Sequence, residues 1–121
     1  MRLTALGQAF TVCKVENWDG VDMTQPFAFT ACTDEEKSLV CPTTAVPART
    51  LAREDGWRGL RIQGELDFSL VGILARIASL LAENGIALFA VSTYNTDYLF
   101  MKEAAFEKAL QILSDNGYEI I

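Results

Sequence analysis

Two amphipathic segments in the second half of the chain constrain its fold most strongly. In residues 69–84 and again in about residues 103–115, apolar side chains recur at spacings of three and four. This spacing predicts two α-helices, each with a single apolar face that must be buried. Asn84-Gly85 and Asn116-Gly117 supply the stops. The two stripes are Leu70, Ile73, Leu74, Ile77, Leu80, Leu81 and Ala105, Phe106, Ala109, Leu110, Leu113.

Short apolar runs around these helices predict strands. Residues 57–64 alternate polar and apolar side chains from Leu60 on, and residues 86–93 are largely apolar. A polar turn at 94–96 leads into a returning strand at 97–102, and residues 118–121 form a closing strand. The predicted order is strand–helix–strand–strand–helix–strand. Two helices with one apolar stripe each must cover the same face of an antiparallel sheet, which predicts an α+β, ferredoxin-like domain over residues 56–121.

The first half of the chain is a fainter version of the same plan. Residues 9–16 are typical of a strand, and residues 27–33 and 38–41 of a hairpin. A shift of sixty positions places Thr33 on Thr93 and Leu39 on Leu99. The connections are too short for helices of similar length, and Pro42 and Pro47 interrupt the segment after the hairpin. We therefore expect residues 1–55 to form a reduced, helix-poor module.

Composition excludes several classes of function. Sixteen acidic and ten basic side chains give a net charge of −6, which disfavours nucleic acid as a partner. The absence of histidine removes Ser-His and Cys-His nucleophiles and histidine metal sites. The three cysteines, Cys13, Cys32 and Cys41, form no C-x-x-C pair and suggest buried free thiols in a reducing cytoplasm. We expect no catalytic residue, no metal and no cofactor.

The start of the chain lacks the sustained apolar region of a signal peptide. The longest later uncharged stretch, residues 84–96, is too short to cross a bilayer. The sequence therefore predicts a cytoplasmic protein with no membrane partner.

Two segments are candidates for ligand binding. Residues 64–72 join a strand to a helix, where free backbone N–H groups and the helix dipole favour a carboxylate, and Gly72 permits close approach. An ordinary capped loop explains the same residues. Residues 92–97 combine hydroxyls with the carboxylate of Asp97, which is suited to an ammonium or guanidinium group. On spacing alone, a polar hairpin turn is the better interpretation of this second segment.

Three blocks carry a family resemblance. Residues 54–64, the D-F-S-L-x-G block at 67–72 and the S-T-Y-x-T-D block at 92–97 closely resemble small ACT-domain proteins related to aspartate kinase regulatory domains, a group that includes the arginine sensor CASTOR. The resemblance implies a βαββαβ ACT fold, ACT modules paired within and between chains, and a small amino acid bound at a module or subunit interface. This chain departs from the family in its short first module.

The resemblance also implies site residues. The loop and helix start facing the ligand would be Asp67, Phe68, Ser69, Leu70, Val71 and Gly72. Ser92 and Thr93 would line the strand end, and Asp97 would lie near a basic group. We therefore expect a homodimeric, non-catalytic sensor of a small free amino acid. The alternative is a ligand-free protein-interaction subunit that uses the ACT fold for oligomerisation.

Overall fold

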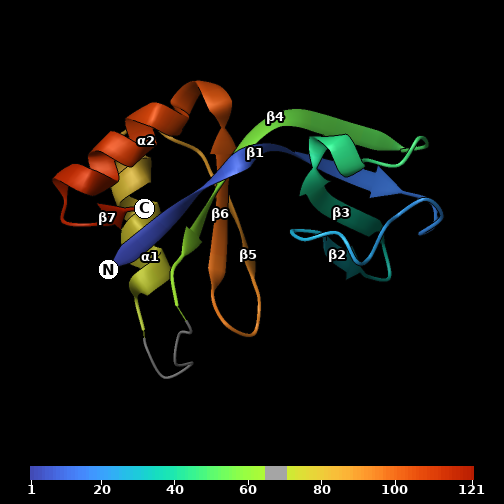
Figure 1. Ribbon diagram of the computed structural model, residues 1–121, viewed down its shortest axis with the longest axis horizontal. Helices are drawn as coiled ribbons and strands as arrows, with labels where there is room; N and C mark the ends of the chain where they lie inside the picture. The colour runs from blue at the N-terminus through green and yellow to red at the C-terminus, as the bar shows by residue number, and fades with distance from the viewer. Residues whose placement is uncertain (65–70) are drawn as a thin grey trace. The chain divides into compact units, whose positions relative to one another are not determined.

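The apolar stripes of the second half form two α-helices in the computed structural model, which describes residues 1–64 and 71–121 (Figure 1). The helices are α1 (Ile73–Glu83) and α2 (Glu103–Asp115). The chain divides into two units: Met1–Gly7 with Arg58–Ile121, here called the helical unit, and Gln8–Trp57, here called the β unit. Two long strands, β1 (Arg2–Val15) and β4 (Ala52–Ile62), contribute residues to both units.

The helical unit follows the predicted order of elements. After β4 come α1, the hairpin of β5 (Phe89–Ser92) and β6 (Asp97–Lys102), α2 and the short β7 (Glu119–Ile120). The start of α1 corrects the prediction, because Val71 and Gly72 precede the helix. Gly72 has φ +79°, a left-handed value outside helical geometry, so the regular helix begins at Ile73.

The sheet of the helical unit includes the first residues of the chain, in β1. β5 pairs antiparallel with β6, β6 lies beside β4, and β4 lies beside β1. β7 pairs in parallel with β1, with Arg2 opposite Glu119. The strand predicted at residues 9–16 therefore starts much earlier, at Arg2. Leu3 and Leu6 are both buried although they are three residues apart, which breaks the two-residue alternation that identifies a strand.

The helices and strands of the helical unit share one apolar core. Ile77 and Leu81 of α1 and Phe106 and Leu113 of α2 pack there, as the stripes predicted. The sheet contributes Leu3, Leu60, Ile62, Leu99 and Met101. Both helices therefore cover the same face of the sheet, and each fully buried large side chain contributes about 1.5–3 kcal/mol. No helix within residues 1–64 and 71–121 is long and apolar enough to span a membrane.

The β unit contains no α-helix. It consists of parts of β1 and β4 with β2 (Phe29–Cys32), β3 (Lys37–Pro42) and the single 3-10 turn η1 (Thr43–Ala45). Its strand order is β2-β3-β1-β4. A small core of buried strand residues has Trp18 and Val46 packed against it; the strand residues are Cys13, Val15, Leu39 and Cys41.

The two hairpins repeat each other at an offset of sixty residues. In the β unit Phe29 is opposite Val40, and in the helical unit Phe89 is opposite Phe100. Their turns also match. The Thr33 N–H donates to the Glu36 carbonyl at 2.9 Å, and the Thr93 N–H donates to the Thr96 carbonyl at the same distance. The weak self-similarity of the sequence therefore reflects a structural repeat of the hairpin.

Candidate functional site

The predicted site begins where β4 ends. The buried hydroxyl of Thr96 donates to the carbonyl of Ile62 at 2.8 Å, so the β5–β6 turn lies beside the end of this strand. The predicted loop residues Asp67, Phe68, Ser69 and Leu70 lie outside the described residues, and their contact with a ligand stays a prediction.

The hairpin residues of the predicted site bind one another. The Ser92 hydroxyl donates to Asp97 Oδ1 at 2.5 Å, and the Thr93 hydroxyl donates to the Thr96 carbonyl at 3.1 Å. These contacts close the turn at the end of the hairpin. They are the arrangement that the polar-turn interpretation predicted, and a ligand at this place must compete with them.

Gly72 lies directly before the first residue of α1. Its carbonyl accepts the Arg76 N–H at 2.9 Å, and a Cβ added at Gly72 would meet no atom of residues 1–64 or 71–121 within 4 Å. Its left-handed φ accounts for glycine at this position. Beside it, Val71 is 90% exposed.

A pocket of about 470 Å³ lies along this flank of α1. The helix wall carries Gly72, Ile73, Arg76, Ser79, Leu80 and Glu83. Arg76 and Glu83 are seven residues apart, which places their backbones about 10 Å apart along the helix. In the part of the chain that the structure describes, neither side chain takes part in an ion pair.

The opposite wall of the pocket comes from distant parts of the sequence. It consists of Asn116, Gly117 and Tyr118, which connect α2 to β7, together with Met1. Of the predicted site residues, the pocket includes Val71 and Gly72, and its described lining does not include Ser92, Thr93 or Asp97.

Sequence reasoning missed most of this pocket. Arg76, Ser79 and Glu83 interrupt the apolar stripe and are typical of a solvated helix flank. From the sequence, Asn116-Gly117 indicates only the end of a helix. The one usable signal is the three- and four-residue spacing of Arg76, Ser79 and Glu83, which places them on a common flank of the helix.

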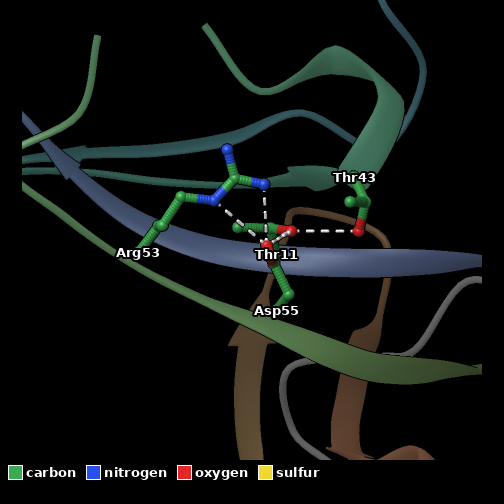
Figure 2. A network of polar contacts seen from close by, with 4 residues as sticks. All are labelled: Thr11, Thr43, Arg53 and Asp55. Carbon is green, nitrogen blue, oxygen red and sulfur yellow. Dashed lines mark hydrogen bonds and ion pairs between the residues drawn. The ribbon is translucent and has the colours of Figure 1, made fainter. Parts of the chain in front are cut away.

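The β unit holds a second polar cluster (Figure 2). The buried Thr11 hydroxyl donates to Asp55 Oδ1 at 2.6 Å and lies 2.9 Å from the Thr43 hydroxyl. Arg53 donates to the same Asp55 oxygen through Nη2 at 2.9 Å and Nε at 3.2 Å. Because Thr11 has given its only proton to Asp55, Thr43 is the donor to Thr11. The cluster fastens η1 to β1 and β4, and we assign it a structural role.

The three cysteines differ in environment. Cys13 and Cys41 are buried free thiols, as expected, whereas Cys32 at the end of β2 is exposed, which corrects the prediction. Burial raises the pKa of Cys13, and burial together with Cys13 raises the pKa of Cys41 to about 11. At neutral pH the two buried thiols are therefore protonated and weakly nucleophilic. Among the described residues no group of three or more Cys, Asp or Glu side chains is placed to hold a metal ion.

Solved structures resemble the chain over nearly its full length. Protein Atu0741 from Agrobacterium tumefaciens is 27% identical, with a TM-score of 0.87 over 99% of this chain and 91% of that one. Protein VC0802 from Vibrio cholerae is 21% identical, with a TM-score of 0.72 over 94% of this chain and 88% of that one. These likenesses show a shared fold.

A regulated enzyme contains the same fold. The aspartate kinase of Clostridium acetobutylicum, an allosteric enzyme, is 14% identical, with a TM-score of 0.65 over 89% of this chain and 32% of the kinase. No curated protein sequence matches the chain. The family model for the ACT domain matches residues 52–115, which is more than half of the sequence. As the sequence blocks predicted, the chain belongs to the ACT domain family.

Proposed function

We propose that the protein is a non-catalytic regulatory ACT protein that senses a small free amino acid. The observation that carries this proposal is the pocket beside Gly72, where Arg76 lines a cavity of about 470 Å³ and has no ion-pair partner among the described residues. Arginine presents parallel donors that match a carboxylate. The occurrence of the same fold in an allosteric aspartate kinase supports a regulatory role.

The rest of the pocket suits the remainder of an amino acid. Ile73 and Leu80 offer apolar surface to a carbon chain, and Glu83 places a negative charge at the far end of the helix wall. A ligand with a second carboxylate would meet Glu83 unfavourably. We therefore expect neutral and basic amino acids to bind better than acidic ones.

The affinity should be modest. A free amino acid has few non-hydrogen atoms, so its binding energy is limited and dissociation constants in the micromolar range or weaker are expected. Such affinities suit a metabolite that is abundant in the cytoplasm, where we propose that the protein acts. A ligand regulates only by binding one conformational state better than another.

We further propose that the first half is a reduced ACT-like module, residues 1–55 by the sequence prediction. The repeated hairpin supports this, with η1 following β3 where α2 follows β6. We also propose that the protein forms a homodimer, in which each chain contributes its own two modules.

A specific observation favours the alternative of a ligand-free interaction subunit. β2 and β5 lie at the ends of the strand order, and neither the Phe-Thr-Ala-Cys nor the Phe-Ala-Val-Ser segment carries a charge. Edge strands that are not blocked by charges can pair with another chain. This alternative predicts a stable oligomer that responds to no amino acid.

A thermal-shift screen with the twenty amino acids separates the two functions. Sensing predicts a rise in melting temperature with one or a few neutral or basic amino acids, and a smaller rise in Arg76→Glu. Lys14→Glu makes the same charge change at an exposed residue outside this pocket and should keep the response. A flat screen on folded protein, or an unchanged response in Arg76→Glu, would contradict the proposal.

A further inference from the structure

We infer that the β unit carries a second binding site, for a small zwitterionic ligand. A pocket of about 350 Å³ lies between the turn that follows β1 and the segment that precedes β4. Its lining is Glu16, Asn17, Asp19 and Gly20 on one wall and Ala48 and Arg49 on the other. This volume lies within the range of known small-ligand pockets.

Both walls of this pocket are fixed to one core. Trp18, between the lining residues of the first wall, packs against the apolar cluster of the β unit, and its carbonyl accepts the Val21 N–H at 3.1 Å. On the other wall, Val46 packs against the same cluster and Pro47 is buried. The pocket is therefore held open by packed side chains rather than by an unsupported loop.

Gly20 lies close to Pro47, which precedes the second wall in the sequence. A Cβ at this position would lie 3.5 Å from the Cβ of Pro47, and the backbone has φ +79°. The Asn17 side chain also accepts the Asp19 N–H at 2.9 Å, which fixes the turn. Any larger residue at Gly20 would be strained by its backbone conformation.

The charges around the pocket identify the class of ligand. Arg49 supplies a guanidinium and Glu16 and Asp19 supply carboxylates, yet none of the three forms an ion pair within the described ranges 1–64 and 71–121. A simple anion would meet two carboxylates, and a simple cation would leave Arg49 uncompensated. A zwitterion satisfies both signs, with its carboxylate on Arg49 and its ammonium on Glu16 or Asp19.

The position of this pocket matches that of the pocket beside α1. The pocket beside α1 is lined by residues that precede the β5–β6 hairpin and by residues that follow α2. The pocket in the β unit is lined by residues that precede the β2–β3 hairpin and by residues that follow η1. The inference does not depend on the proposed function, because it uses different residues in a different unit. The lining charges are exposed, so binding should be weak and should weaken further as salt is added.

An NMR titration of the ¹⁵N-labelled chain with L-alanine tests the site. We expect saturable shifts of the Asp19, Gly20, Ala48 and Arg49 amides. Propionate lacks the ammonium group and ethylammonium lacks the carboxylate, so each should bind at least several-fold more weakly. Arg49→Glu should weaken alanine binding at these amides at least tenfold, whereas Arg76→Glu should leave it unchanged.

Three results would overturn the inference. These are the absence of saturable shifts at the four amides, equal binding of alanine and its two singly charged analogues, and unchanged binding in a folded Arg49→Glu variant. Amide shifts at Gly72, Arg76 and Gly117 report separately on the pocket beside α1. The two proposals can therefore fail independently.

Discussion

The two units contain similar hairpins but differ in the element that follows each hairpin. In the helical unit β6 runs directly into the thirteen residues of α2, whereas in the β unit β3 runs into the three residues of η1. Pro42 ends β3 and Pro47 follows η1 closely, and proline in a helix interior removes a hydrogen bond and clashes with the preceding turn. Pro47 would lie in the interior of a helix that began at Thr43, so this proline accounts for the single turn.

The helix α2 and the turn η1 are held in place by different kinds of interaction. α2 is fixed by apolar side chains such as Phe106 and Leu113, which are buried completely or nearly so. η1 is fixed by the Thr43–Thr11 contact of the polar cluster and by the partly buried Ala45, which packs against the small core of the β unit. Burial of a large apolar side chain contributes about 1.5–3 kcal/mol, and a net hydrogen bond about 0.5–1.5 kcal/mol.

The largest expected effect is therefore in the core of the helical unit. Ile77→Ala should lower the free energy of unfolding by about 2–5 kcal/mol, because it removes a fully buried side chain and leaves a cavity. Thr43→Ala in the β unit should cost only about 1 kcal/mol. Urea denaturation measures both. Similar losses for the two variants would contradict the contrast between the units.

The second prediction concerns stability in alkali. The pKa of Cys41 is about 11 in the folded state against an ordinary value of 9.0, so the unfolded chain releases this proton first as pH rises. The stabilisation is fully present below pH 9 and is lost between pH 9 and 11, by up to about 3 kcal/mol.

Cys41→Ala is the control for this titration, because it removes the thiol and keeps the lysines and tyrosines of the chain. The difference in unfolding free energy between wild type and Cys41→Ala should shrink as pH rises from 9 to 11. A constant difference would show that Cys41 does not titrate abnormally.

The third prediction isolates the polar cluster. Thr11→Val keeps the side-chain volume but removes the donor to Asp55, and should cost about 1 kcal/mol. Combined with Thr43→Ala in a double-mutant cycle, it should show a coupling energy of about 0.5–1.5 kcal/mol. Additive losses would mean that the contact between the two hydroxyls does not stabilise the fold.

The smallest effects test the repeat itself. Thr33→Ala and Thr93→Ala each remove the turn hydroxyl of one hairpin, and each should cost about 0.5–1 kcal/mol. Chemical denaturation of the two single variants under identical conditions measures the costs. Values that differ by more than about 1 kcal/mol would mean that the two turns are alike only in backbone geometry.

Local patterns predicted the elements better than the site. The stripe containing Ile77 and the stripe containing Phe106 identified both helices, because the helical period follows from the spacing of apolar residues alone. The start of β1 was missed because Leu3 and Leu6 do not alternate, and the start of α1 was misplaced because the conformation of Gly72 is not evident from its neighbours.

The pocket beside α1 could not be predicted from local pattern. Its walls join Arg76 to Tyr118 and Met1, and only the tertiary fold brings these residues together. The predicted hairpin residues Ser92 and Asp97 are adjacent, as their spacing implied, but they bind each other in the structure. The residue types of Ser92 and Asp97 indicated hydrogen bonding, but they did not indicate whether the partner is a ligand or another residue of the chain.

The central claim is that an amino acid binds in the pocket beside Gly72. The most direct test is the structure of a crystal grown in the presence of a mixture of amino acids. The account predicts an amino acid in the pocket beside Gly72, with its carboxylate within hydrogen-bond distance of the Arg76 guanidinium. A pocket occupied by the protein's own side chains in every copy, or a ligand bound away from Arg76, would contradict it.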